Sequence, residues 1–416
     1  MSYRRTTSPF EDADVLEEDY QPDEILGRDE ELEHLRTVFQ PIIDAEPPRN
    51  AFLYGLSGLG KTASTKYEIS ELTDSVANYD DISLETIWLN CNDCSSSYQV
   101  AITLANQLLP ARDQLPRSGL PKSQVYETLF EALDAIGDGD TDVRDYVIIV
   151  LDEVDNIGSQ DRILYQIPRA RANGRLENVW PALIGISNDL SFKEGLSSKV
   201  TSSLCEHEIT FSSYNATELQ EILLHRSQRA FKEGTIKDGV IELTAAYGAQ
   251  EGGDARYALD LLRRGGQLAK DEEEVRLEHI ERAREELERD RMLEAIESMD
   301  KHEHMTIAAL VTLHLQNETP VGRKELYPVY RQYAEEIIGE VNASRRVHDY
   351  LSNMHMLGLI KRAEVQEGIG EETRFEYSLD SLSTEMAVQA LERLDVPGHP
   401  ETNRTIPSKL QQLLGD

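Results

Sequence analysis

The chain has 416 residues, which at roughly 150 residues per domain indicates about three domains. It carries 42 Lys and Arg against 77 Asp and Glu, a formal net charge of −35, and 39% of its residues are apolar. No apolar run approaches the ~18 residues of a membrane span, and the N-terminus lacks the apolar core of a secretory signal. Three cysteines are too few for a disulfide framework, so we expect a cytoplasmic protein with packed cores and no membrane partner.

The acidic residues are spread over the whole chain, and only 12 of the 42 basic residues are lysine. Dispersed acid with few lysines is typical of proteins that stay hydrated in molar salt; an ordinary acidic protein is the alternative. If the protein is adapted to molar salt, its net charge is a property of the solvent-facing surface. A nucleic-acid partner is therefore judged from local charge.

The first 20 residues are predicted to form a disordered acidic tail, because Glu11–Asp19 holds six carboxylates and no basic residue. A helix is expected over residues 29–39. Short apolar runs, separated by helical patterns, then predict strands at Ala51–Tyr54, Thr86–Leu89, Val147–Leu151, Leu183–Ser187 and His207–Phe211. Strands that alternate with helices indicate an α/β fold with a five-stranded parallel sheet.

Beyond residue 212 the sequence predicts amphipathic helices in place of strands. They are expected at residues 216–231, 239–247, 255–268 and 277–299. Residues 301–395 hold short helices and then a hairpin pattern between Leu359 and Leu379.

The segment Gly55–Thr62 matches G-x-x-x-x-G-K-[ST] between a predicted strand and a predicted helix, the context that a phosphate loop requires. Its glycines allow backbone amides to wrap a phosphate at a helix N-terminus. Lys61 would reach the β- and γ-phosphate oxygens, and Thr62 would be a ligand of Mg²⁺. The expected nucleotide contacts of the loop are Gly58, Leu59, Gly60, Lys61, Thr62 and Ala63.

Polar residues follow the next two buried strands. Asp152 and Glu153 end the most apolar strand, where Asp152 would hold Mg²⁺ and Glu153 would polarise the attacking water. Asn188 ends the following strand and is placed to orient that water. Lys61, Glu153 and Asn188 are therefore the predicted catalytic residues.

These motifs, with Gly253-Asp254-Ala255-Arg256 after them, come in the order of the AAA+ ATPases, which the chain resembles. Longer segments are more specific: ILGRDEELEHL, GISNDLSFKEGL, SSYNATELQEILLHR and GDARYALDLLRR look like the archaeal origin-recognition replication initiators, over about residues 20–395. Together with the acid-rich composition, this resemblance implies a haloarchaeal source. The resemblance implies an AAA+ core over residues 21–211, a helical lid over 212–299 and a C-terminal winged-helix domain over 300–395; residues 396–416 form a tail.

The resemblance implies three further nucleotide contacts. Arg256 matches the second-sensor arginine, Tyr214 stands at the entry to the lid, where a ring can cover adenine, and Arg226 lies on the first lid helix. The sequence departs from the family at Lys199, where an arginine finger is usual; lysine cannot clamp a phosphate bidentately, and such a finger is worth ~10³-fold or more in rate. Gly27 replaces a usual histidine, which argues against an adenine-side role for Arg28.

The winged helix would carry the DNA contacts. Its recognition helix is predicted at residues 343–356, with the hairpin as the wing. Between residues 341 and 363 there are four basic residues and one acid, which is informative in a chain of charge −35. The expected contacts are Arg345, Arg346, Lys361, Arg362 and Arg374; a winged helix used for protein contact is the alternative.

Other basic and metal-like patterns are weaker. Residues 162–175 hold four arginines and no acid, and could contact DNA, a partner or solvent alone. Residues 105–130 cover the place of the family's DNA-contacting insertion. Cys91 and Cys94 resemble half a zinc site without a regular second pair, so we expect no zinc.

The leading hypothesis is an ATP-dependent replication initiator with slow ATP hydrolysis, using ATP/ADP and Mg²⁺. Its partners would be double-stranded origin DNA, the replicative helicase and other copies of the initiator, in association with the nucleoid. One alternative is a nucleotide-locked DNA-binding regulator or minor paralogue with little turnover, which Lys199 favours. Another is an AAA+ helper of a mobile element or clamp-type assembly.

Overall fold

The computed structural model describes residues 7–137, 139, 142–158, 161–204, 207–272, 274–365, 374–379 and 386–387. The chain divides into two compact units, residues 1–281 and 282–416. The predicted domain boundaries within these units stay predictions, and the predicted tail over residues 396–416 lies outside the described residues. No helix of the described part is long and apolar enough to cross a membrane.

The first unit is built on a five-stranded sheet in which every neighbouring pair of strands is parallel. In spatial order the strands are β2 (Ile82–Asn90), β3 (Arg144–Asp152), β4 (Val179–Ser187), β1 (Ala51–Tyr54) and β5 (His207–Thr210). All five were predicted, although β2, β3 and β4 begin earlier than expected. The carboxyl ends of β1, β3 and β4 meet at one edge, which is where ligands bind in open α/β sheets.

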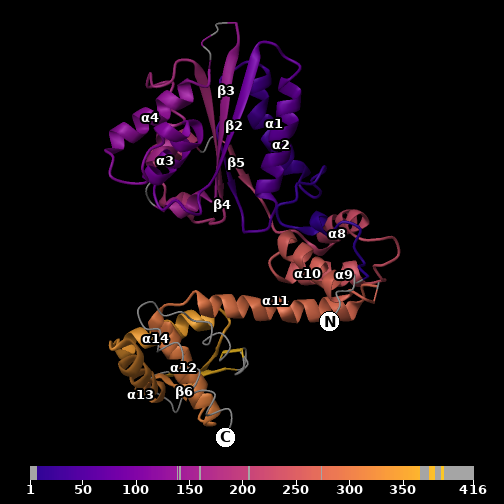
Figure 1. Cartoon of the computed structure of the whole chain (residues 1–416), viewed down its shortest axis with the longest axis vertical. Coiled ribbons are helices and arrows are strands. Elements are labelled where there is room, and N and C mark those ends of the chain that lie inside the picture. The colour runs from indigo at the N-terminus through magenta and orange to yellow at the C-terminus, as the bar shows by residue number, and fades with distance from the viewer. Residues whose placement is uncertain are drawn as a thin grey trace. The chain divides into compact units, whose positions relative to one another are not determined.

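Helices cover both faces of this sheet, as expected for a parallel sheet whose strands are buried on both sides. On one face lie α1 (Asp29–Ile43) and α2 (Lys61–Val76), and on the other α3 (Ser97–Leu108) and α4 (Lys122–Asp134) (Figure 1). Val147 and Phe52 are fully buried in the core beneath α3 and α4. Shorter helical segments are η2 (Ala111–Asp113), η3 (Val154–Ile157), α5 (Arg162–Gln166), α6 (Phe192–Gly195) and α7 (Ser198–Leu204).

The lid follows β5 and consists of α8 (Ala216–Ala230), α9 (Val240–Gln250) and α10 (Ala255–Leu268). Asn215 and Glu218 form a capping box that fixes the start of α8. Asp254 caps α10 by accepting a hydrogen bond from the Tyr257 amide. The lid thus begins at a defined residue directly after the sheet.

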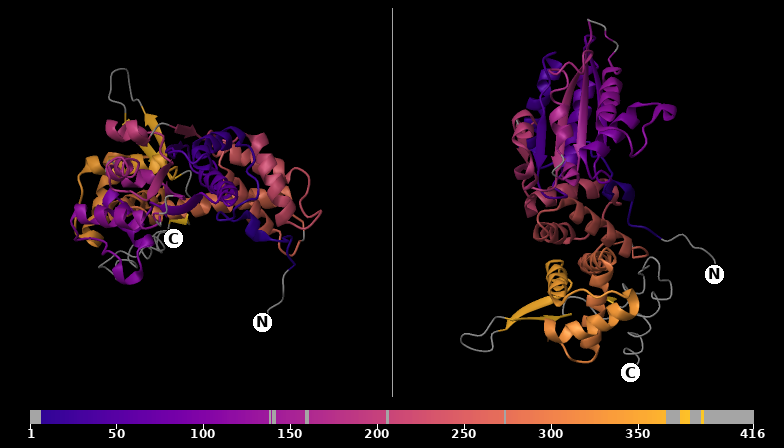
Figure 2. Two further views of the ribbon diagram at one scale, coloured as in Figure 1. Left: turned by 90° about the horizontal axis from the view of Figure 1, so that it is seen from above. Right: turned by 90° about the vertical axis from the view of Figure 1, so that its left-hand side faces the viewer.

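The prediction of a disordered N-terminal tail is wrong for residues 7–20. Ala13–Leu16 forms a short 3-10 helix, η1, which packs on α8 and α10 (Figure 2). The Phe10 ring lies 4.6 Å from that of Phe231, and Val15 and Leu16 are buried. The apolar residues that interrupt the carboxylates bury enough surface to order the segment, and the acids around them face arginines of the lid.

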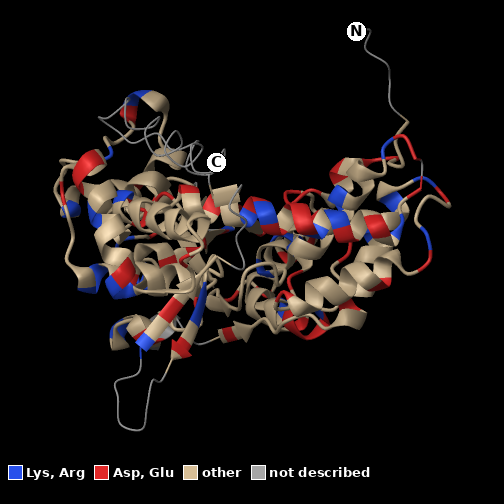
Figure 3. Ribbon diagram, turned by 90° about the horizontal axis from the view of Figure 1, so that it is seen from below, with Lys and Arg blue, Asp and Glu red and all other residues tan. Residues whose placement is uncertain are grey.

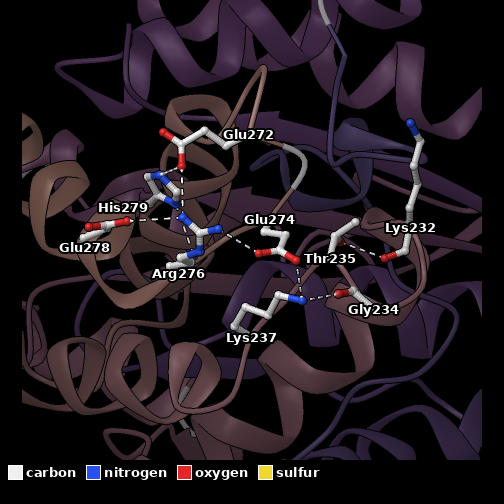
Figure 4. Close-up of polar contacts among 9 residues, drawn as sticks. All are labelled: Lys232, Gly234, Thr235, Lys237, Glu272, Glu274, Arg276, Glu278 and His279. Atoms are coloured by element: carbon white, nitrogen blue, oxygen red, sulfur yellow. Dashed lines mark hydrogen bonds and ion pairs between the residues drawn. The ribbon is translucent and has the colours of Figure 1, made fainter.

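A polar network joins two lid segments at residues 232–237 and 272–279 (Figure 4). Arg276 pairs with Glu272, Glu274 and Glu278 at 2.8–3.7 Å. Lys237 pairs with Glu274 at 2.8 Å. Since these ion pairs are exposed, each contributes only about 0–1 kcal/mol.

Helix α11 (Leu277–Glu297) crosses the division between the units, and basic and acidic residues alternate along it (Figure 3). The second unit continues with α12 (Lys301–Leu315), α13 (Arg323–Tyr333), η4 (Ala334–Ile338) and α14 (Ser344–Met356). A three-stranded antiparallel sheet, in the order β6 (Val321–Gly322), β8 (Arg374–Ser378), β7 (Lys361–Val365), completes a winged helix. The predicted recognition helix and hairpin therefore both form; residues 366–373, between β7 and β8, lie outside the described residues.

Candidate functional site

The predicted phosphate loop joins the end of β1 to the start of α2. Gly58 and Gly60 have φ of +74° and +86°, a left-handed backbone that glycine adopts without strain. Lys61, Thr62 and Ala63 form the first turn of α2, whose N-terminal amides carry partial positive charge. The loop and helix therefore have the geometry of an anion site.

Lys61 is 4% exposed and its Nζ donates hydrogen bonds to the carbonyls of Gly55 (2.8 Å) and Leu56 (2.6 Å). Burial lowers the pKa of its ammonium to about 8, opposed by the charges of Asp152 and Asp155. The side chain is thus held over the loop by weak neutral acceptors. A phosphate oxygen is a stronger acceptor for this ammonium.

Thr62 and Asp152 meet across the sheet edge. The Thr62 hydroxyl donates a 2.9 Å hydrogen bond to Asp152 Oδ2. Asp152 is 5% exposed, and burial raises its pKa against the opposing effect of this hydrogen bond. A hydroxyl and a carboxylate, both hard oxygen donors, are the ligand set that Mg²⁺ takes beside phosphates.

Glu153 follows Asp152 in a left-handed conformation, with φ of 54°. Such strain in a non-glycine residue is concentrated at functional sites. Burial raises the pKa of the Glu153 carboxyl, with further increases from the charges of Asp152 and Asp155 and a decrease from Arg256. Its position beside the phosphate loop suits a carboxylate that polarises water.

Asn188 lies directly after β4 and is fixed through its backbone: its amide donates to Asp155 Oδ1 at 3.1 Å. Asp155 belongs to the turn after Glu153. The strand-end asparagine and the acidic turn are therefore held together, as their order along neighbouring strands predicts.

The lid reaches the loop through α10. Arg256 Nη1 donates to Ser57 Oγ at 3.3 Å, and the Ala255 amide donates to the Gly58 carbonyl at 3.1 Å. A Cβ at Gly58 would collide with the Asp254 carboxylate. Glycine is therefore required at this position both for its φ and for the approach of the lid.

Arg226, on α8, is 8% exposed, and its Nη1 has no hydrogen-bond partner among the described residues. Its guanidinium lies 4.4 Å from the centroid of the Tyr20 ring. A buried guanidinium N–H without an acceptor is costly unless a ligand supplies one. This orphaned donor is the feature of the lid that best fits an anionic ligand.

Arg28 is a residue whose structural role the sequence did not indicate. It is 2% exposed; its Nε donates to the Leu59 carbonyl (3.0 Å) and its Nη2 to the Ser212 carbonyl (2.7 Å). Its Cζ lies 3.6 Å from the centroid of the Tyr214 ring. Arg28 thus connects the phosphate loop to the entry of the lid and covers one face of Tyr214, where adenine stacking was predicted.

The arginines of residues 162–175 stack on aromatic rings. Arg162 lies over Tyr126, Arg169 over Tyr165, Arg171 over Trp180 and Arg175 over Phe130, at 4.1–5.5 Å. These contacts give the basic stretch a packing role within the unit.

Two groups of side chains carry atoms that can bind metal: the cysteines and one acidic cluster. Cys91 and Cys94 are buried, and burial raises the pKa of both thiols; Cys205 lies outside the described residues. Glu272, Glu278 and His279 bring ligand atoms together. The Arg276 guanidinium, however, already pairs with both carboxylates (Figure 4).

In the second unit the predicted DNA contacts lie on two elements. Arg345 and Arg346 are exposed in the first turn of α14. Lys361 and Arg362 begin β7, and Arg374 begins β8, the strand paired to it. Arg362 lies 4.6 Å from the Phe375 ring, and Arg374 pairs with Glu376 at 3.4 Å.

Three family models together match about three quarters of the chain. An AAA ATPase domain matches residues 24–174, the Cdc6 AAA+ ATPase-type lid domain residues 220–285, and the CDC6 C-terminal winged helix domain residues 294–387. The fold and site thus define an AAA+ ATPase with a lid and a winged helix.

The relatives are more specific. The chain is 44% identical to ORC1-type DNA replication protein 11 of Haloarcula marismortui, over 94% of this chain and 93% of the relative. It is 39% identical to ORC1-type DNA replication protein 10 of Halobacterium salinarum, over 94% and 93%. The solved structure of the Aeropyrum pernix ORC1 protein in complex with DNA is 34% identical, with a TM-score of 0.76 over 92% of this chain and 96% of that one. This chain belongs to the ORC1-type DNA replication protein family, as the sequence motifs predicted.

Proposed function

We propose that this protein is an ATP-dependent replication initiator that binds origin DNA and helps to load the replicative helicase. The proposal is supported by the family to which the chain belongs and by the site at the sheet edge. The observation that carries its nucleotide half is the Thr62–Asp152 hydrogen bond at the phosphate loop, which the lid reaches through the contact of Arg256 with Ser57. The buried Arg226 N–H, which has no partner among the described residues, adds a lid donor that suits an anionic ligand.

Each residue has a role in this proposal. The loop amides and Lys61 bind the phosphates of ATP, and Arg226 and Arg256 hold them from the lid side. Thr62 and Asp152 would hold Mg²⁺, which supplies neutralising charge at the phosphate oxygens.

Glu153 accepts a proton from the attacking water, and Asn188 orients that water. Hydrolysis to ADP resets the lid.

The DNA half rests on the winged helix. The Aeropyrum pernix relative was solved in complex with DNA. The exposed Arg345 and Arg346 occupy the start of α14, the part of a recognition helix that reaches base edges. We assign origin recognition to this helix, with Lys361, Arg362 and Arg374 as contacts to the flanking backbone.

ATP turnover and equilibrium binding test the nucleotide half on the full-length protein. Glu153→Gln keeps the size of the side chain and removes the base, so ATP binding stays and single-turnover hydrolysis falls by about 10²–10⁴-fold. Lys61→Ala, as the matched control, loses binding itself. Hydrolysis that Glu153→Gln leaves unchanged would overturn the ATPase assignment.

A second function is favoured by Lys199, which is exposed on α7 where relatives would place an arginine finger. In this second function the protein keeps one bound nucleotide with little turnover and acts as a DNA-binding regulator. Lys199→Arg separates the two functions: it raises the multiple-turnover rate of an initiator that acts in trans and leaves a locked regulator unchanged. Capture of the replicative helicase by the ATP-bound protein, but not by the ADP-bound protein, would support the loading role.

A further inference from the structure

The N-terminal segment contacts the lid arginines that are assigned to the nucleotide. Backbone hydrogen bonds from Glu11 and Asp12 to the Ala230 carbonyl, at 2.9 and 3.1 Å, fasten it to the end of α8. From this anchor η1 leads residues 17–20 toward the phosphate loop. Gln21 then donates to the Ala63 carbonyl on the first turn of α2, at 3.1 Å.

Two residues of this segment reach the assigned nucleotide arginines. Glu18 Oε1 lies 3.0 Å from Arg256 Nε, and the Tyr20 ring lies under the guanidinium of Arg226. The same Arg256 donates to Ser57 of the phosphate loop through Nη1. Glu18 therefore places a carboxylate on the arginine that joins lid and loop.

The Glu18–Arg256 pair also acts electrostatically on the residues of the site. Arg256 acts electrostatically on both Lys61 and Glu153, whose pKa values it lowers. The Glu18 charge also reaches Glu153, whose pKa it raises. Arg256 and Glu18 therefore lie within electrostatic reach of Glu153, the residue assigned to the water that attacks the γ-phosphate.

We propose that Glu18 competes with the γ-phosphate of ATP for Arg256 and so lowers the preference of the site for ATP over ADP. A γ-phosphate held by Arg256 would meet the Glu18 carboxylate that pairs with Nε, whereas ADP lacks that phosphate and leaves the ion pair intact. The inference deepens the proposed function and rests on the nucleotide site assigned there. Glu18 and Arg256 are 65% and 46% exposed, so their contact is an exposed one and the expected effect is about two- to fivefold in relative affinity.

The chain offers a matched control in the neighbouring residue. Glu17 pairs with Arg263 at 3.4 Å, a lid arginine with no assigned nucleotide contact. Glu17→Gln and Glu18→Gln remove the same charge one residue apart on the same segment. In about 1 M KCl the screening length is about 3 Å, so the long-range electrostatic effect of each substitution is suppressed.

Equilibrium titration of the full-length protein with ATP and with ADP, in the presence of Mg²⁺, tests the proposal. Glu18→Gln is expected to tighten ATP binding about two- to fivefold relative to ADP, and Glu17→Gln to leave the ratio unchanged. In an Arg256→Ala background Glu18→Gln should have no further effect, because the contested group is gone.

Two results would overturn the inference while the proposed function stands: an unchanged ATP/ADP ratio in Glu18→Gln, or an equal change of the ratio in Glu17→Gln. If the wild-type protein binds neither nucleotide, the proposed function fails and this inference fails with it. If Glu18→Gln shifts the ratio equally in the Arg256→Ala background, the effect does not pass through Arg256 and the inference is wrong.

Discussion

The Arg28 guanidinium lies 3.6 Å from the centre of the Tyr214 ring and donates to the carbonyls of Leu59 and Ser212. One buried side chain thus links the phosphate loop to the entry of the lid. Replacing it leaves two carbonyls without a donor and removes a cation–π contact.

Arg28→Met is therefore expected to destabilise the first unit by about 2–4 kcal/mol. Arg28→Lys should recover little, because an ammonium cannot reach both carbonyls and stack on the ring. Trp88 and Trp180, the two tryptophans of the chain, both lie in the sheet of this unit, so thermal unfolding followed by their fluorescence reports on it. An unchanged unfolding midpoint in Arg28→Met would contradict the role of Arg28 as a structural link.

Alanine substitutions at two adjacent glycines distinguish the effect of backbone strain from the effect of steric collision. Gly252 and Gly253 have φ of +79° and +74°, so alanine at either costs about 1–2 kcal/mol. At Gly253 the added Cβ would meet the backbone of Tyr214 and the Cβ of Ser213, whereas at Gly252 it meets nothing within 4 Å. Gly253→Ala should weaken ATP binding by about tenfold or more, because it displaces the lid entry and Arg256. Gly252→Ala should bind ATP as the wild type does; equal losses in isothermal titration would show that strain alone matters.

Arg226 should affect binding and stability in opposite directions. Arg226→Met keeps the length of the side chain and removes a buried guanidinium whose Nη1 lacks a partner among the described residues. Binding of ATP and of ADP should fall by about 10–100-fold, as expected for the loss of a charge-assisted hydrogen bond. The unfolding midpoint without nucleotide should stay equal or rise. A fall in both quantities would identify Arg226 as a structural residue.

The second unit should lose stability as the pH falls through about 6.5. His304 is 6% exposed; burial lowers its pKa, against the opposing effect of its Nε2 hydrogen bond to the Ile296 carbonyl at 2.7 Å. His304 therefore takes up a proton at a higher pH in the unfolded chain than in the folded chain. The free energy of unfolding has its full value above the ordinary pKa of 6.5 and declines below it. Hydrogen exchange of α12 between pH 7.5 and 5 measures this loss, and His304→Gln should reduce its pH dependence. Exchange that is independent of pH after correction for intrinsic rates would contradict the prediction.

The DNA contacts of the recognition helix should appear in the salt dependence of binding. Each phosphate contact contributes about −0.9 to the slope of log K against log salt. Lys361→Ala should lower the slope by about one contact equally on all duplexes. Arg345→Ala should instead lower the discrimination between sequences, by about 1–3 kcal/mol for a lost base contact. Anisotropy titrations at several KCl concentrations distinguish the two, and identical behaviour of both variants would contradict their assignment.

The sequence predicted which strands form the sheet, but it predicted less well where those strands begin. The run Val147–Leu151 identified β3 because a strand buried on both faces is continuously apolar. In β4 the prediction began at Leu183, whereas the strand starts at Val179 and passes through Pro181. Proline usually ends a strand because it lacks a backbone N–H donor. The sequence pattern therefore did not indicate that residues 179–182 belong to β4.

Long-range contacts account for what the sequence did not reveal. The carboxylates of residues 11–19 resemble a solvated tail unless their partners on the lid, such as Arg256 and Arg263, are known. The spacing of Phe10, Val15 and Leu16 was a signal of burial, but its docking surface on α8 and α10 lies more than 200 residues away in sequence. The role of Arg28 was hidden for the same reason, since its acceptors belong to two distant loops.

Occupancy of the host genome, mapped by crosslinking and immunoprecipitation, tests the central claim most directly. The wild-type protein should give a few sharp peaks where replication begins, and the Arg345→Ala/Arg346→Ala variant, expressed at the same level, should lose them. Peaks at promoters that are unrelated to replication starts, or peaks that persist in the double variant, would contradict an origin binder that recognises DNA through α14.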